Sequence, residues 1–152
     1  MDIIRQVAIA ADVSLVWRAW TEPDRITEWF APAAVIEPKI GGKFELYFNP
    51  ENRDSMSTKG CTILHIDKPK SLVFEWKGPD PFADIINRGE LTFVEVSFEP
   101  GEEGTIVTLT HKGWKASPDW NRAREWHAAA WTDMLASLKS SLESGQGLLC
   151  CE

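Results

Sequence analysis

The chain has 152 residues, of which 43% are hydrophobic and 26% are charged, which is enough for one hydrophobic core and too little for two. Its 16 basic and 23 acidic residues give a net charge of −7, and no basic cluster is present that could follow a phosphate backbone, so a nucleic-acid partner is not expected. No apolar run approaches the roughly 20 residues of a membrane-spanning helix, and the N-terminus lacks the apolar stretch of a secretory signal, so we expect a cytoplasmic protein without membrane contact.

The first 30 residues predict one strand followed by two short helices. The strand covers residues 3–10, and Asp12 then provides the N-cap of a helix over residues 13–20. The Pro-containing segment 21–23 ends this helix and begins a second one that ends near Phe30. Two short helices with a bend between them suit the closing of one end of a sheet.

From residue 33 onward the hydrophobic period changes to two, which predicts strands joined by short turns. The expected strands cover residues 35–40, 43–48, 58–67, 71–76, 90–99 and 105–112. Gly41 and Gly42 are expected to form a tight hairpin turn between the first two. Segments 49–57 and 77–88 are polar or contain Pro and Gly, so both are expected to be irregular connections.

Residues 119–144 predict one long helix with Gly145 as its C-cap. Its apolar stripe contains Trp120, Ala123 or Arg124, His127, Trp131, Met134, Leu138 and Leu142. Links of hairpin length imply an antiparallel sheet, and only this helix is long enough to cover the apolar face of that sheet. The pattern therefore predicts an α+β fold in which a curved antiparallel sheet of about six to seven strands surrounds a long C-terminal helix.

The predicted domain covers residues 1–145, and residues 146–152 form a C-terminal tail. The tail contains Cys150 and Cys151, which match neither a zinc-site spacing nor a redox CxxC motif. A tail that is redox-active or forms an intermolecular disulfide and a frayed terminus are both compatible with this pair. Cys61 lies in a predicted strand, where a free cysteine usually behaves as a small buried hydrophobe.

Four groups of residues occur along the chain in an order typical of one protein family. They are VWRAWTEP and WFAP at residues 16–23 and 29–32, GGKF at 41–44, LVFEW at 72–76, and the final hairpin at 94–100 and 104–111. Together they resemble the branch of the SRPBCC (START-like, helix-grip) superfamily that is named after the activator of the heat-shock protein 90 ATPase. Ala130 stands where family members often have Gly, and His65 stands where they often have Glu.

The resemblance implies a helix-grip fold with a hydrophobic cavity between the sheet and the long helix. Members of the superfamily bind lipids, sterols, polyketides or plant hormones, and a minority are enzymes. The eukaryotic namesake stimulates a chaperone ATPase, which implies a chaperone-associated stress-response role as an alternative. That role also uses a separate N-terminal domain, which this chain is too short to contain.

Eight tryptophans and seven phenylalanines are a heavy aromatic load for a chain of this length. Those with inward parity on the sheet or on the helix stripe are candidates to line a ligand cavity, together with two histidines. The candidate ligand-binding residues are Phe44, Phe48, Phe74, Trp76, Phe98, His111, Trp114, His127 and Trp131. Each aromatic ring alone also fits ordinary core packing, and the pattern leaves both interpretations open.

His111 shares its strand parity with inward-facing residues, and His127 lies one helical turn before Trp131. Either histidine is a candidate to donate a hydrogen bond to a ligand carbonyl or to act as a general base, and either also fits a structural role. No third residue at metal-ligand spacing accompanies them, and no nucleophile, phosphate-binding or redox motif is visible, so neither a metal, a cofactor nor a catalytic residue is assigned.

The sequence supports three functional hypotheses. The first is a binding protein for a hydrophobic small molecule, either lipid-like or an aromatic metabolite. The second is a cyclase- or hydrolase-type enzyme that uses the histidines of the cavity. The third is the chaperone-associated role, which rests on the resemblance alone. A monomer and a homodimer are both compatible with the pattern.

Overall fold

The structure is a computed structural model and describes residues 2–145. Its elements follow in the expected order, with one strand, two short helices, six further strands and a long helix at the end. They are β1 (Ile3–Ile9), α1 (Val13–Thr21), α2 (Pro23–Ile26), β2 (Ala33–Ile36), β3 (Phe44–Tyr47), β4 (Ile63–Asp67), β5 (Ser71–Trp76), the 3-10 turn η1 (Asp80–Phe82), α3 (Ala83–Ile86), β6 (Thr92–Gly101), β7 (Gly104–Lys112) and α4 (Pro118–Ser144). The predicted tail with Cys150 and Cys151 lies outside the described residues.

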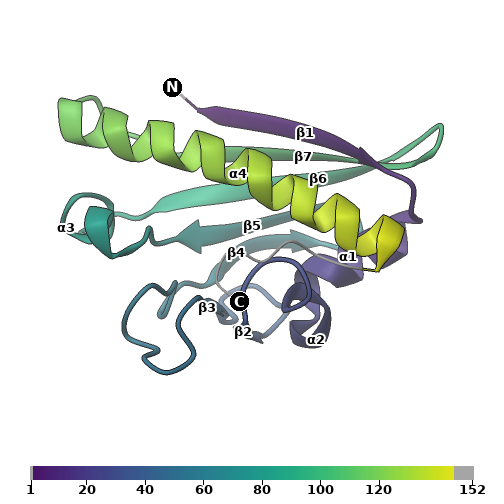
Figure 1. The fold of residues 1–152 in the computed structure, drawn as a ribbon, viewed down its shortest axis with the longest axis horizontal. Helices are drawn as coiled ribbons and strands as arrows, with labels where there is room; N and C mark the ends of the chain where they lie inside the picture. Colours follow the sequence, from purple (N-terminus) through teal and green to yellow (C-terminus); the bar gives the residue numbers. More distant parts are fainter. Residues whose placement is uncertain (1, 146–152) are drawn as a thin grey trace.

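Five strands form one antiparallel sheet in the order β1-β7-β6-β5-β4, and β2 and β3 form a second, two-stranded sheet. The two sheets meet where the N–H of Phe44 donates to the carbonyl of Cys61 over 2.9 Å, next to a bridge between Lys43 and Thr62. α4 lies across one face of the larger sheet, and α1 and α2 lie at one end of it (Figure 1). The α+β helix-grip architecture expected from the sequence is therefore confirmed.

α4 begins and ends where its capping residues dictate. The side chain of Ser117 accepts a hydrogen bond from the N–H of Trp120 over 3.1 Å, and Pro118 occupies the first turn, where its missing N–H costs nothing. Gly145 closes the helix in the left-handed region with a φ of 82°. Ala123, His127, Trp131 and Leu138 of the expected stripe are buried, together with Leu135, Ser137 and Ser141, which the stripe did not include. Trp120, Met134 and Leu142 of the stripe are half-buried.

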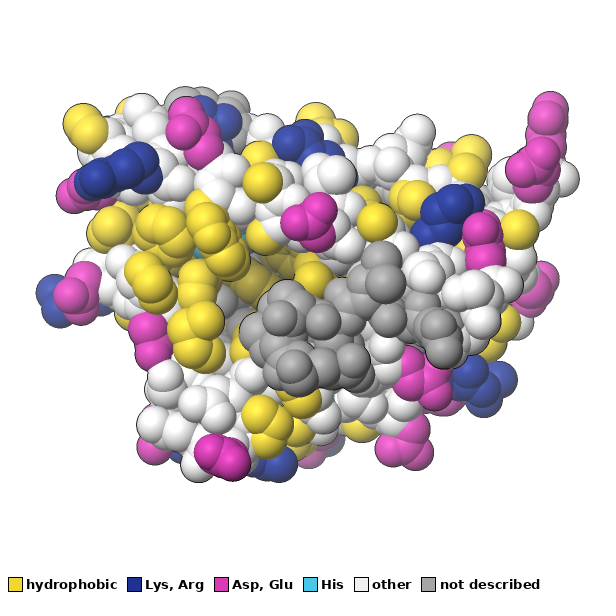
Figure 2. Space-filling model, viewed as in Figure 1, with side chains coloured by type: hydrophobic (Ala, Val, Ile, Leu, Met, Phe, Trp, Pro, Cys, Tyr) yellow, Lys and Arg dark blue, Asp and Glu magenta, His cyan; other side chains and the backbone are white. Residues whose placement is uncertain are grey.

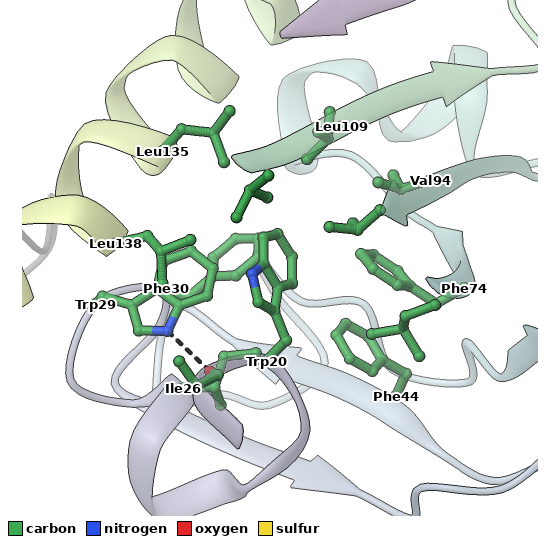
Figure 3. Packing of buried hydrophobic residues seen from close by; sticks show 14 of the residues in the cluster. Trp20, Ile26, Trp29, Phe30, Phe44, Phe74, Val94, Leu109, Leu135 and Leu138 are labelled. Atoms are coloured by element: carbon green, nitrogen blue, oxygen red, sulfur yellow. Dashed lines mark hydrogen bonds between the residues drawn. The ribbon is translucent and has the colours of Figure 1, made fainter. Parts of the chain in front are cut away.

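The core at the α1–α2 end is built from aromatic rings (Figure 3). The indole of Trp20 packs edge-on against Trp29 with 4.7 Å between ring centroids, and the N–H of Trp29 donates to the carbonyl of Ala19 over 2.9 Å. Phe44 and Phe74 stack across the two sheets with 4.0 Å between their centroids. These rings are fully buried, so this end of the molecule is tightly packed.

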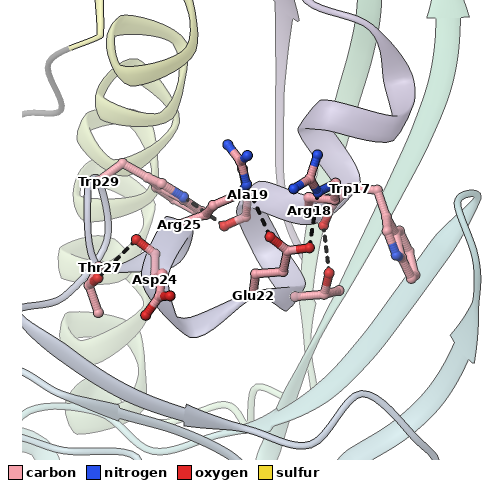
Figure 4. A network of polar contacts seen from close by, with 9 residues as sticks. Trp17, Arg18, Ala19, Glu22, Asp24, Arg25, Thr27 and Trp29 are labelled. Carbon is pink, nitrogen blue, oxygen red and sulfur yellow. Dashed lines mark hydrogen bonds and ion pairs between the residues drawn. The ribbon is translucent and has the colours of Figure 1, made fainter.

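The bend between α1 and α2 is held on the outside by a small ionic network (Figure 4). The carboxylate of Glu22 lies 3.0 Å from Nε of Arg18 and 3.0 Å from Nε of Arg25. The hydroxyl of Thr21 donates to the carbonyl of Trp17 over 3.0 Å. Exposed ion pairs of this kind contribute little to stability, so burial of Trp20 and Trp29 holds the bend.

Two turns differ from the prediction. Gly41 and Gly42 do not form a two-residue hairpin turn, because β2 ends at Ile36 and β3 begins at Phe44. Position 42 instead requires glycine because the backbone of Glu37 lies very close to it. A Cβ atom on Gly42 would lie 2.1 Å from the carbonyl oxygen of Glu37. In the last hairpin the strands pair as far as Gly101 and Gly104, so that turn is shorter than the expected loop over residues 100–104.

The two segments predicted to be irregular differ from one another. Residues 77–88 contain η1 and α3, whereas 49–57 form a loop that contacts η1. In this contact the N–H of Met56 donates to the carboxylate of Asp80 over 2.9 Å. β4 begins later than expected, at Ile63, because residues 58–61 form a turn in which the N–H of Cys61 donates to the carbonyl of Thr58 over 3.0 Å.

Candidate functional site

A pocket of about 310 Å³ lies between the middle of α4, the end of β5 and the loop before β4. Aromatic rings, two methionines and small residues make most of its wall. The lining residues are Phe30, Phe48, Met56, Ser57, Trp76, Lys77, Gly78, Pro79, Trp126, His127, Ala130, Trp131, Asp133 and Met134. Figure 2 shows hydrophobic side chains gathered around a hollow on the face that carries α4. The wall is thus apolar, with few polar groups.

His127 is the polar residue that is most deeply buried in this wall. Its Nδ1 lies 2.7 Å from the carbonyl oxygen of Ala123, one turn earlier in α4, so Nδ1 carries the proton and donates to that oxygen. Nε2 is then a hydrogen-bond acceptor, and it is buried without a partner among residues 2–145. Burial lowers the pKa of His127 to about 4, against a smaller opposing effect of the Ala123 hydrogen bond. The ring is therefore neutral at pH 7.

His111 is fully buried behind the pocket and is not part of its lining. Its Nδ1 accepts from the indole N–H of Trp131 over 3.0 Å, which places the proton of the neutral ring on Nε2. Nε2 lies 2.9 Å from the hydroxyl of Thr92 and donates to it. Burial, and then the nearby His127, lower the pKa of His111 well below its ordinary value. Both nitrogens of His111 are thus engaged, and this residue positions Trp131.

Trp76, the last residue of β5, lies at the centre of the pocket wall. Its ring centroid is 5.0 Å from that of Trp131, 6.1 Å from Phe30 and 6.2 Å from His127. The indole Nε1 of Trp76 is buried and has no hydrogen-bond partner within the described part of the chain. Among residues 2–145, the wall therefore contains one buried unpaired donor, on Trp76, and one buried unpaired acceptor, on His127.

Gly78 forms the wall next to His127. A Cβ atom at this position would lie 2.5 Å from Cδ1 of Ile86 and 3.2 Å from Cε1 of His127, so only glycine fits without displacing a neighbour. Asn87 holds the segment in place by accepting from the N–H of Gly78 over 2.7 Å and donating to its carbonyl over 3.0 Å. The amide side chain of Asn87 thus fixes this wall from the end of α3.

A family model described as Activator of Hsp90 ATPase homolog 1-like protein matches residues 10–143. The chain belongs to this family. No curated protein matches the chain. The sequence-based assignment to this branch of the SRPBCC superfamily is therefore confirmed, and the match includes every residue that lines the pocket.

Solved structures share the fold of this member of the Activator of Hsp90 ATPase homolog 1-like family. Protein SSP2350 from Staphylococcus saprophyticus is 22% identical, with a TM-score of 0.75 over 97% of this chain and 96% of the other. The Aha1 dimer from Colwellia psychrerythraea is 21% identical, with a TM-score of 0.73 over 97% and 99%. CalU16 from Micromonospora echinospora is 23% identical, with a TM-score of 0.68 over 93% and 74%. At these identities the likeness concerns the fold.

The structure separates the nine predicted site residues of this family member into three groups. Phe48, Trp76, His127 and Trp131 line the pocket. The other five do not line it: His111 and Trp114 lie behind the wall, with 4.6 Å between their ring centroids, and Phe44, Phe74 and Phe98 pack in the core.

Several lining residues were not among the predicted ones. Met134 lies on the predicted helix stripe, and Phe30 belongs to the WFAP motif at residues 29–32, so the sequence pattern includes both. Trp126 is 48% exposed, and Met56 lies in the loop over residues 49–57, and no periodicity identified either. Among residues 2–145, no cluster of His, Cys, Asp and Glu is arranged to bind a metal ion, and no helix is long and apolar enough to cross a bilayer.

Proposed function

We propose that this protein binds one hydrophobic small molecule, lipid-like or aromatic, in the pocket between α4 and the end of β5. The observation that carries the proposal is the apolar wall formed by Phe30, Phe48, Trp76 and Trp131 around about 310 Å³. Concave apolar sites of this size with a few polar groups are typical of small-molecule binding. The binding of lipids, sterols and polyketides by other members of the superfamily supports the same conclusion.

The position of the pocket relative to the core also supports binding. The tightly packed rings of Trp20, Trp29 and Phe74 belong to the same core cluster as Trp76 and Trp131, so a packed core lies behind the pocket wall. Each square ångström of apolar surface that a ligand covers contributes about 25 cal/mol, so covering even about 100 Å² contributes about 2.5 kcal/mol.

A pair of matched variants tests the proposal. Ala130 lines the pocket and the adjacent Ala129 is exposed on the same helix, so Ala130→Trp fills the pocket and Ala129→Trp leaves it open. We expect thermal-shift and calorimetric titrations with medium-chain alcohols and naphthalene derivatives to detect binding to wild type and Ala129→Trp, and at least a tenfold loss in Ala130→Trp. Equal affinities in the three proteins, or no binding to any of them, would refute the proposal.

The enzyme hypothesis has less support. Both nitrogens of His111 are engaged with Trp131 and Thr92, and His127 has a pKa of about 4, far from the value of an effective general base at neutral pH. The chaperone-associated role, the homodimer and the cytoplasmic location stay predictions. The dimer named for the Colwellia psychrerythraea relative makes a measurement of molar mass in solution worthwhile.

A further inference from the structure

Building on the proposed function, we infer that the ligand carries a hydroxyl group, as an alcohol or a phenol does, and that its O–H donates a hydrogen bond to Nε2 of His127. This specifies the ligand class beyond its being hydrophobic. Four observations support it: the tautomer of His127, the unpaired N–H of Trp76, the charges on the wall and the complete pairing of His111.

The tautomer of His127 makes its free nitrogen an acceptor. Nδ1 donates to the carbonyl of Ala123 over 2.7 Å, back along α4. Cε1, the carbon bonded to both ring nitrogens, faces Gly78, and Gly78 and His127 both line the pocket, so this edge of the ring lies at the pocket wall. The side chain is 1% exposed, and Nε2 has no partner among residues 2–145. A buried acceptor of this kind is costly unless a donor reaches it.

The second buried unpaired atom of the pocket lining is the indole Nε1 of Trp76, which is a donor. The rings of Trp76 and His127 meet edge-on at 88°, with 6.2 Å between their centroids. Two hydrogen bonds of about 2.9 Å that meet at one tetrahedral oxygen join atoms about 4.7 Å apart, a spacing compatible with rings whose centroids are 6.2 Å apart. A hydroxyl both donates and accepts, so one hydroxyl can serve His127 and Trp76 together. A carbonyl or an ether can serve only Trp76.

The charges on the wall disfavour an ionised acid. The charged residues that line the pocket are Lys77 and Asp133. Nζ of Lys77 donates to the carbonyl of Lys59 over 2.7 Å and keeps its charge, which Asp133 balances, so the wall has no net positive charge to hold a carboxylate. His127 is neutral and offers no proton on Nε2. A neutral hydroxyl compound therefore fits the wall better than a carboxylate of the same shape.

His111 does not compete for the ligand, since its two nitrogens are paired with Trp131 and Thr92. Its role is to hold the indole of Trp131 in the wall, so the polar recognition of the ligand is left to His127 and Trp76. The inference can therefore be tested on a single residue, His127.

The test compares 2-naphthol with 2-methylnaphthalene, which has nearly the same shape but no hydroxyl, by calorimetric titration at pH 7. We expect 2-naphthol to bind wild type more tightly, although its hydroxyl is the better hydrated group in water. In His127→Phe, which keeps an aromatic ring in the wall, the affinity ratio of the two compounds should fall about tenfold, as expected for one lost hydrogen bond. The affinity of the same variant for 2-methylnaphthalene is the reference, because a change in the shape of the wall affects both compounds and leaves their ratio unchanged.

A second measurement needs no variant. The 15N resonance of His127 Nε2 in wild type should move upfield on addition of 2-naphthol and stay in place on addition of 2-methylnaphthalene. An unchanged affinity ratio in His127→Phe, or an unmoved Nε2 resonance in a protein saturated with 2-naphthol, overturns the inference and leaves the proposed function standing. Binding of neither compound, nor of any other apolar probe, overturns both.

Discussion

The indole N–H of Trp131 donates to Nδ1 of His111 over 3.0 Å, and this bond joins α4 to β7 through the core. On its other side, His111 donates from Nε2 to the hydroxyl of Thr92 at the start of β6, over 2.9 Å. Three elements are thus connected by one chain of buried polar groups, with Trp131 at 2% exposure and both other residues at 0%. These hydrogen bonds fix the orientation of the Trp131 ring, which faces the pocket.

The first prediction concerns these hydrogen bonds between Trp131, His111 and Thr92. His111→Phe leaves the N–H of Trp131 and the hydroxyl of Thr92 buried without their partner, so the free energy of unfolding should fall by about 2–4 kcal/mol. Trp131→Phe should cost a similar amount on its own. The double variant removes both the N–H of Trp131 and Nδ1 of His111, so neither is left unpaired. Its loss of unfolding free energy should therefore be at least about 1 kcal/mol smaller than the sum of the losses in the two single variants. Urea denaturation measures all three, and strict additivity would contradict the pairing.

The second prediction concerns acid stability. In the unfolded chain His127 has its ordinary pKa of 6.5, whereas in the folded protein its pKa is about 4. As the pH falls below 6.5 the unfolded chain takes up a proton that the folded protein does not, so the contribution of His127 to stability is fully present above pH 6.5 and is lost down to about pH 4. Between pH 7 and pH 5 the loss from His127 should be about 2 kcal/mol.

His111, whose pKa is also lowered, should contribute in the same direction. Urea denaturation at both pH values, in wild type and in His127→Phe, separates the two histidines. In the variant, only the pH dependence of stability that is due to His111 should remain. An equal dependence on pH in both proteins would show that His127 is not buried in its neutral form.

The third prediction compares two neighbouring glycines. Gly41 has a φ of 79° with open space around it, so Gly41→Ala should cost only about 1 kcal/mol of backbone strain. At Gly42 a Cβ atom would lie 2.1 Å from the carbonyl oxygen of Glu37. This is a backbone atom, which cannot move aside as the end of a flexible side chain can. Gly42→Ala should therefore destabilise the protein several times more, by about 3 kcal/mol or above. Melting temperatures of the two variants test the ranking, which the reverse order would contradict.

The fourth prediction concerns the wall at Gly78. A Cβ atom there meets Cδ1 of Ile86 at 2.5 Å and Cε1 of His127 at 3.2 Å, so Gly78→Ala should shift both side chains and reduce ligand affinity at a cost of about 1 kcal/mol in stability. Ile86→Val removes the Cδ1 atom and should restore part of the stability in the double variant. Stability that does not recover would mean that the clash lies with His127 or with the backbone.

The period of the hydrophobic residues predicted most of the fold. α4 was recognised from its stripe and from Gly145, because a helix that covers a sheet must bury residues every three or four positions. The hairpin of β6 and β7 followed from strict alternation. The turn at Gly41 and Gly42 was not recognised, because the need for Gly42 arises from contact with Glu37 and not from the local turn type.

The pocket was harder to predict, for a physical reason. Alternation tells which face of a strand a side chain occupies, but not how far along the sheet the packed core extends. Phe74 and Trp76 share one face of β5, yet Phe74 stacks on Phe44 in the core while Trp76 lines the pocket. The unpaired Nε2 of His127 depends on the bond from Nδ1 to Ala123, which no spacing in the sequence records.

The closeness of Trp76 and Trp131 has an optical consequence. Their ring centroids are 5.0 Å apart, a distance at which excitation passes between indoles faster than either emits. A ligand that touches one of them therefore changes the emission of both. Trp126, 48% exposed at the rim, emits at longer wavelength than these buried rings. Occupancy of the pocket can thus be followed in the unlabelled protein by its own fluorescence.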